Sequence, residues 1–310
     1  MNEPDANRDS DRQVAAEMLR AAADVARSLH ARALLAYLDA VVDVDALRNL
    51  DAGQADLILV VRDRTGAQVA SALGFHSITV PPVTLTRMGQ IKTATLIAFS
   101  QRLLETGDQL VFLAGPAHRR LDTIVVMSVG DEWEMFQTVD QPRLTEHIKR
   151  AVFERVLRIA LELAAEGREG KAVGALFVLG DHHNVDEYCQ QIILNPFKGY
   201  LEAERNVLDE NVRETVKSYA TLDGAFILKG NGVIISAGTY LKGLKTGSPL
   251  QQGLAARHAA AAGITASTHC IAVTVSQSTG TVRVWRRGQM ITEIEKPPHA
   301  SGDGTLSDVD

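Results

Sequence analysis

The sequence is poor in cysteine and in aromatic residues, and it lacks long apolar runs. Its 310 residues include only Cys189 and Cys270 as cysteines, which excludes a disulfide framework and fits a reducing compartment. No stretch of about 18 consecutive apolar residues occurs, so the sequence predicts no membrane span. The polar, acidic start also lacks the apolar segment of a signal peptide. We therefore expect a cytoplasmic protein with no membrane partner.

The chain also has no excess of positive charge. Its formal net charge is −6 at pH 7, whereas a nucleic-acid-binding surface needs a basic face. Nucleic acid is therefore not expected as the main partner, although a local basic pocket for a nucleotide remains compatible with this charge. The other fractions, 45% hydrophobic and 23% charged, are those of an ordinary globular protein, and the length suits two domains.

Helical patterns alternate with short apolar runs in the first part of the chain. The expected segments, in order, are a helix at 12–31, strands at 33–38, 57–61 and 77–80, a helix at roughly 92–105, and strands at 109–115 and 122–129. This alternation predicts a layered α/β domain with a mostly parallel sheet, which we place at 12–142. It has no phosphate-binding loop and no GxGxxG motif. The first dozen residues are polar and are expected to be disordered.

The order of segments up to about residue 130 resembles the C-terminal regulatory domain of pyruvate kinases. The resemblance depends on a helix that leads through Gly107-Asp108 to a strand, a glycine-containing loop and a final strand. It implies a domain without catalytic groups. A packing and dimerisation module and an effector-binding site both remain open.

A second α/β unit is expected at 143–296, with a mixed central sheet and a disordered tail at 297–310. Its expected segments are an amphipathic helix at 143–168, strands at 173–179 and 191–194, a polar helix at 202–219, strands at 222–228 and 233–238, a helix at 249–262, and strands at 270–276 and 281–286. Ser248 and Pro249 predict the start of the last helix, and Gly263 predicts its end.

Asp223 stands just before Gly224-Ala225 at the start of a predicted strand. A ligand can approach the backbone closely at such a glycine, and the carboxylate can hold a divalent metal or orient a hydroxyl. Taken alone, an ordinary aspartate at a strand entry is the simpler interpretation.

Arg257 and His258 interrupt a helix that otherwise consists mostly of alanine. Arginine offers a planar fork that suits phosphate oxygens, and histidine can bind a phosphate or a metal. The alternative is an arginine on the solvent face beside a histidine packed at an interface. A third segment, 276–280 (SQSTG), is either a plain turn between strands or a set of hydroxyls and amides for a phosphate.

The order of these motifs resembles the diadenylate cyclase domain. The shared features are the DGA sequence on a strand, SAGTYL at 236–241, an Arg-His pair on an alanine-rich helix, and VSxxTG at 275–280. The sequence NPFKGY at 195–200 makes the soluble archaeal-type cyclases the most similar branch. The resemblance implies condensation of two ATP molecules into cyclic di-AMP, with Mg²⁺ or Mn²⁺ as cofactor and self-association into at least a dimer.

The resemblance also implies roles for individual residues. The catalytic residues would be Asp223, Arg257 and His258, with Asp223 as the metal ligand. The ATP-binding residues would be Gly224, Ala225, Gly238, Tyr240, Leu241, Arg257, His258 and Ser276.

Three positions depart from the family pattern. Ala259 replaces the third residue of an Arg-His-Arg motif, and Gln277 and Ser278 replace two glutamates. These departures keep open a catalytically silent nucleotide-binding sensor, and a purely structural module is a third hypothesis. Asp181-His182-His183 with Cys189 could form a zinc site. A polar loop is the simpler interpretation, because the paired spacing of ligands in a structural zinc site is absent.

Overall fold

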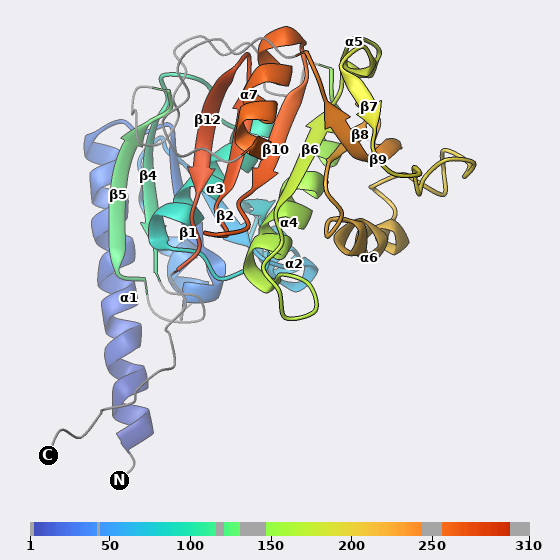
Figure 1. Ribbon diagram of the computed structural model, residues 1–310. Helices are drawn as coiled ribbons and strands as arrows, with labels where there is room; N and C mark the ends of the chain where they lie inside the picture. Colours follow the sequence, from blue (N-terminus) through green and yellow to red (C-terminus); the bar gives the residue numbers. More distant parts are fainter. Residues whose placement is uncertain (1–2, 42–43, 116–120, 131–146, 244–255, 298–310) are drawn as a thin grey trace, which may run out of the picture.

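The structure is a computed structural model, and it describes residues 3–41, 44–115, 121–130, 147–243 and 256–297. A five-stranded sheet in the order β3-β2-β1-β4-β5 forms the first half (Figure 1). Its strands are β1 (Ala33–Tyr37), β2 (Asp56–Val61), β3 (His76–Thr79), β4 (Gln109–Ala114) and β5 (Thr123–Ser128). Neighbouring strands run parallel except β4 and β5. Strand β1 is buried along its whole length, as a strand covered on both faces requires.

Three α-helices belong to this first sheet, namely α1 (Glu3–Ser28), α2 (Arg64–Ala72) and α3 (Arg87–Ser100). Helix α1 lies against β4 and β1, whereas α3 contacts both β4 and a strand of the second sheet. Two side chains fix where α2 and α3 begin, because Asp63 accepts from the amide of Gly66 and Thr86 accepts from the amide of Gly89. Short 3₁₀ turns at Leu38–Ala40 and Val44–Asn49 follow β1.

A seven-stranded mixed sheet in the order β12-β11-β10-β6-β8-β9-β7 forms the second half. Its strands are β6 (Ala175–Leu179), β7 (Cys189–Gln191), β8 (Ala225–Leu228), β9 (Ile234–Leu241), β10 (Ile271–Val275), β11 (Val282–Arg286) and β12 (Gln289–Ile294). Strands β6 and β8 pair in parallel, and the other pairs are antiparallel. The mixed α/β class expected from the sequence is therefore confirmed.

Helices cover both faces of the second sheet. They are α4 (Arg150–Glu166), α5 (His182–Asp186), α6 (Glu210–Tyr219) and α7 (Ala256–Ser267). Alternate residues of β6 point to opposite faces, so Phe177 belongs to the core on the α4 side and Val178 to a smaller core under α7. The larger core continues through α3 and the first sheet to α1. The two halves of the chain thus share one apolar interior.

Several sequence predictions of local structure were wrong. Helix α1 begins at Glu3, so the first dozen residues are not all disordered; acidic residues at a helix start favour it through the helix dipole. Strand β7 ends at Gln191, and the next three apolar residues are exposed. Helix α7 continues through Gly263 to Ser267, because Gly263 has no positive φ and therefore does not terminate it. The predicted start at Ser248 lies outside the described residues.

Candidate functional site

The three polar motifs of the sequence meet at one edge of the second sheet. Asp223 comes just before β8, Arg257 lies in the first turn of α7, and Ser276 follows β10 directly. The parallel strands β6 and β8 begin at this edge, and β10, antiparallel to β6, ends there. Arg257 Nη2 lies 3.2 Å from Asp223 Oδ1, which links the first two motifs directly.

Gly174, immediately before β6, brings the third motif to the same place. A β-carbon at this position would lie 2.6 Å from Arg257 Nη1 and 3.1 Å from Gln277 Cβ. The guanidinium of Arg257 therefore passes directly over Gly174, beside the turn at 276–280. Gly174 could not be predicted as a site residue, because the apolar pattern of a strand does not reveal which side chain crosses its start.

The pair formed by Asp223 and Arg257 is open to solvent. The side chain of Asp223 is 91% exposed and that of Arg257 is 28% exposed. Ion pairs exposed to this degree contribute little to stability. Both groups are therefore accessible to a ligand, and a phosphate could replace the carboxylate as the partner of the guanidinium.

Two glycines hold the entry of β8 close to β9. Gly224 has φ +106° and Gly238 has φ +66°, values that side-chain-bearing residues rarely adopt. A β-carbon on Gly224 would lie 2.6 Å from the backbone nitrogen of Thr239. The glycine of the DGA motif is thus needed for this close approach, which holds Asp223 against β9.

Tyr240 and Leu241 occupy the end of β9 and point in opposite directions. Tyr240 is 57% exposed, whereas Leu241 is buried in the core under α7 together with Ala225. Of these three residues, only Tyr240 presents its side chain to a ligand or a partner in this conformation.

His258 lies on the buried face of α7, with 4% of its surface exposed. Its Nε2 lies 2.8 Å from Nη1 of Arg283, a residue of β11 that the sequence analysis did not single out. Arginine can only donate, so Nε2 accepts and the ring proton sits on Nδ1. Burial, together with the charge of Arg283, lowers the pKa of His258 to about 4. The imidazole is therefore neutral at pH 7, and its contact with a triphosphate stays a prediction.

Ser276 holds the turn at 276–280 in shape. Its hydroxyl lies 3.3 Å from that of Ser278 and accepts from the amide of Thr279 at 3.4 Å. Gly280 has φ +66°, and a β-carbon there would lie 2.5 Å from Cε of Lys296. The lysine side chain therefore crosses this turn and places a cation beside the serine motif. The sequence did not reveal this cation.

The zinc hypothesis finds no support among the described residues. Within the described ranges, no group of three or more histidine, cysteine, aspartate or glutamate side chains gathers as a metal site would require. Asp181 instead accepts from the amide of His269 at 2.7 Å, and His182 and His183, expected in a polar loop, lie in the short helix α5. Of the helices described, none is long and apolar enough to cross a membrane.

Two protein families match separate parts of the chain. Residues 162–290, which include every site residue above except Lys296, match a family described as "DisA bacterial checkpoint controller nucleotide-binding". Residues 15–138 match a family described as "Probable sensor domain DacZ_P".

Two curated relatives decide the family. A diadenylate cyclase of Methanocaldococcus jannaschii is 38% identical over 213 residues, which span 66% of this chain and 66% of the relative. A diadenylate cyclase of Haloferax volcanii is 33% identical over 200 residues, which span 64% of this chain and 72% of the relative. This chain belongs to the diadenylate cyclase family.

The family expected from the DGA and Arg-His motifs is thereby confirmed. A solved structure of DacA from Staphylococcus aureus is 24% identical to this cyclase-family chain, covers 45% of it and 83% of itself, and superposes with a TM-score of 0.34. The resemblance of the first half to pyruvate kinases stays a prediction.

Proposed function

We propose that this chain condenses two ATP molecules into cyclic di-AMP and two pyrophosphates, with one ATP held by each of two chains that face each other. Each 3′-oxygen loses its proton, attacks the α-phosphorus of the other ATP, and expels pyrophosphate. One site that holds one ATP cannot close the ring, so the chemistry itself calls for a pair of sites. We assign the reaction to residues 143–296, a regulatory role to residues 12–142, and the cytoplasm as its compartment.

One observation carries the proposal. Asp223, Arg257 and the turn at Ser276 come from three elements far apart in sequence, and they lie together around Gly174. The site offers one exposed carboxylate, one guanidinium and several hydroxyls. Phosphoryl transfer depends mainly on positioning and on neutralisation of charge, which such a set of groups can provide.

We assign to Asp223 the binding of a divalent ion and the positioning of the 3′-hydroxyl. Its exposed carboxylate suits Mg²⁺ or Mn²⁺, because such ions are often held by one or two carboxylates together with the phosphates of the substrate. When bound, the ion would withdraw charge from the α-phosphate and favour the alkoxide form of the attacking hydroxyl.

Arg257 is assigned to the leaving phosphates. On ATP binding its guanidinium would exchange Asp223 for phosphate oxygens, which leaves the carboxylate free for the ion. Gly224, Ala225 and Gly238 would provide the backbone against which the nucleotide lies. Tyr240 would bound the adenine with its exposed side chain, and Leu241, buried behind it, would contribute only through its backbone. Ser276 would donate to a phosphate, and the Nδ1–H of His258 would do so after a local movement of α7.

Incubation of the pure protein with ATP and MnCl₂, followed by chromatography, tests the proposal. We expect cyclic di-AMP and pyrophosphate in a ratio of about one to two, as the stoichiometry of the condensation requires. The product should disappear when EDTA removes the metal, and also in Asp223→Asn, whose circular dichroism spectrum should match that of the parent.

The alternatives give different results in the same experiment. Binding of ATP without turnover would replace the proposal with the silent nucleotide sensor that Ala259, Gln277 and Ser278 keep open. Absence of both ATP binding and turnover would favour the third hypothesis, a purely structural module. Undiminished product from Asp223→Asn would remove Asp223 from the assigned role.

A further inference from the structure

A cavity of about 380 Å³ lies away from the cyclase site and between the two halves of the chain. Its walls come from the segment after β2, the start of α2, the end of β3, α3, α4 and the start of α6. The lining residues are Arg62, Asp63, Arg64, Thr79, Pro81, Ile97, Ala151, Glu154, Arg155, Arg158, Leu208 and Glu210. Four of them are arginines, in a chain whose net charge is negative.

The three carboxylates of this cavity already have partners in the protein. Asp63 accepts from the amide of Gly66 at 2.8 Å. Glu154 accepts from the side chains of Ser100 and Gln101 at 3.2 and 3.0 Å. Glu210 is paired with Arg155 at 2.7 Å, and its charge also acts on Arg158, with which it forms no direct ion pair. Each acidic side chain of the cavity therefore already has a partner in the protein.

Two of the four arginines lack such a partner among the described residues. Arg62 is held by Asp39 and the carbonyl of Val83, but neither Arg64 nor Arg158 makes a hydrogen bond or ion pair with any residue that the structure describes. Burial lowers the pKa of Arg158, although the charges of Glu162 and Glu210 oppose this shift. Two guanidinium groups without a partner among the described residues line the same cavity, an arrangement that an anion would stabilise.

We propose that this cavity binds a small phosphate ester, held between Arg64 of α2 and Arg158 of α4, with Arg155 as a third donor. Guanidinium forks match phosphate oxygens in a bidentate way, which favours a phosphate over a neutral ligand. The cavity is larger than one phosphate group, and Thr79, Pro81, Ile97 and Leu208 provide neutral walls for an organic part. The proposal goes beyond cyclic di-AMP synthesis, because it adds a second ligand and a second site.

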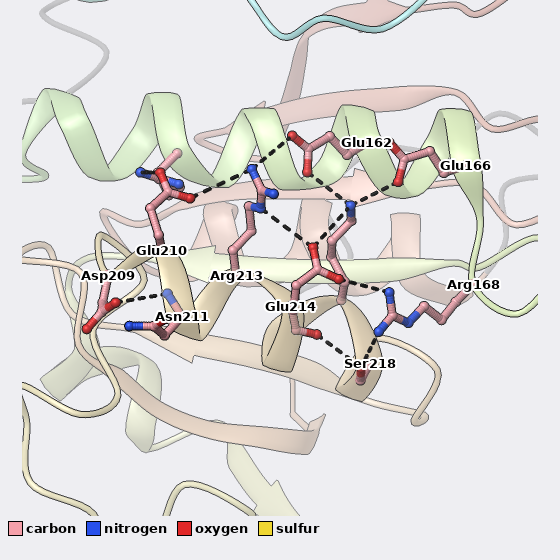
Figure 2. Close-up of polar contacts among 11 residues, drawn as sticks. Glu162, Glu166, Arg168, Asp209, Glu210, Asn211, Arg213, Glu214 and Ser218 are labelled. Carbon is pink, nitrogen blue, oxygen red and sulfur yellow. Dashed lines mark hydrogen bonds and ion pairs between the residues drawn. The ribbon is translucent and has the colours of Figure 1, made fainter.

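The same cavity is connected to the cyclase site through α6. A phosphate that engages Arg155 competes with Glu210, the first residue of α6. Glu210 and Glu162 both lie within 4 Å of Arg213, at 3.7 and 3.8 Å, and Figure 2 shows this chain of contacts between α4 and α6. Helix α6 ends four residues before Asp223. Release of Glu210 would therefore loosen the element that leads into the DGA motif.

Calorimetric titration with glycerol 3-phosphate tests the site, with glycerol as the matched neutral probe. We expect the parent to bind glycerol 3-phosphate and not glycerol. Arg64→Ala and Arg158→Ala should each raise the dissociation constant about tenfold or more, as the loss of a charge-assisted hydrogen bond predicts. Arg64 is exposed, so its variant keeps the test valid if Arg158→Ala fails to fold.

Two control variants separate this cavity from the cyclase site and from a general effect of charge. Arg20→Ala removes an exposed arginine of α1, and Arg257→Ala removes the guanidinium of the cyclase site. Both should bind glycerol 3-phosphate as the parent does. Absence of binding to the parent, or binding that is lost in Arg257→Ala and retained in Arg64→Ala and Arg158→Ala, would overturn the proposed site.

Hydrogen exchange tests the link to α6. Saturation with glycerol 3-phosphate should speed amide exchange in the first turn of α6, because Glu210 loses Arg155 as its partner. Arg155→Ala should show the faster exchange without ligand and little further change with it. Unchanged exchange in saturated parent would contradict the link. Neither readout uses cyclase activity, so failure of this proposal is distinguishable from failure of the proposed function.

Discussion

Gly174 leaves the space that the Arg257 guanidinium occupies. Gly174→Ala would put a methyl group 2.6 Å from Arg257 Nη1, so the guanidinium must leave the position in which it contacts Asp223. We expect cyclase activity to fall by about tenfold or more, the effect of one lost charge-assisted contact, while the melting temperature stays close to that of the parent.

Steady-state kinetics and thermal denaturation of the same preparation measure both quantities. Ala172→Ser, an exposed substitution two residues earlier, serves as the matched control and should change neither of them. Full activity of Gly174→Ala would mean that the position of Arg257 over this glycine is not the one used in turnover.

His258 should make stability depend on pH below neutrality. The folded chain holds this residue neutral down to about pH 4, whereas the unfolded chain takes up the proton near the ordinary pKa of 6.5. The neutral imidazole therefore makes its full contribution to the free energy of unfolding above pH 6.5. As pH falls toward 4, the free energy of unfolding decreases by roughly 1–3 kcal/mol. Urea denaturation at pH 7 and pH 5 should show a larger loss for the parent than for His258→Gln. Equal losses would contradict a buried neutral imidazole.

The sequence predicted the polar groups of the site better than their surroundings. The order of motifs identified Asp223, Arg257 and the serine turn, and the structure brings these three together. It could not predict the bond between His258 and Arg283, because the direction in which a strand residue points depends on the register of β11 within the sheet. The crossing of Lys296 over Gly280 likewise depends on tertiary packing.

At the scale of elements, a buried ionic cluster joins α4 to α6 (Figure 2). Lys217 Nζ lies 3.1 Å from Glu162 and 2.9 Å from Glu166, and both Lys217 and Glu162 are 5% exposed. Burial opposes the charge of this lysine, but the hydrogen bonds that it donates to Glu166 and Glu162 raise its pKa above the ordinary value. The cluster therefore fixes the helix that precedes Asp223.

Lys217→Met should lower the free energy of unfolding by about 3 kcal/mol, because it leaves a buried carboxylate without its cation. Chemical denaturation measures the effect, and Lys198→Met, which changes an exposed lysine, is the control. The double change Glu162→Met with Lys217→Met should recover part of the loss. A loss as small as that of the control would mean that the cluster contributes nothing measurable.

Elements with strong periodicity or continuous apolar runs were predictable, and weakly patterned ones were not. Strands β1, β2 and β4 match the apolar runs within one or two residues. Helix α2 and strand β12 were missed, since the first has nine residues with a glycine near its start and the second mixes polar and apolar residues. The three residues after β7 were predicted as strand because they are apolar. The sequence could not show that they are exposed.

At the scale of the whole molecule, the two halves pack as one body around a shared core. Helix α3 lies against β12, and the carbonyl of Glu295 accepts from the amide of Thr86 at 3.5 Å. The sequence predicted two α/β units but could not predict this contact, which joins segments that are 209 residues apart. The proposed phosphate cavity likewise has walls from both halves, since α4 and the start of α6 face residues of the first half there.

Mixing of the parent with Asp223→Asn tests most directly the claim that two facing sites close one ring. The two proteins should be mixed at constant total concentration, with exchange of chains verified by mass spectrometry of a tagged copy. A pair with one altered site forms at most one of the two bonds, so cyclic di-AMP production should follow the square of the parent fraction, and linear pppApA should accumulate. Production that stays proportional to the parent fraction, under verified exchange, would contradict the account and require both bonds to form on a single chain.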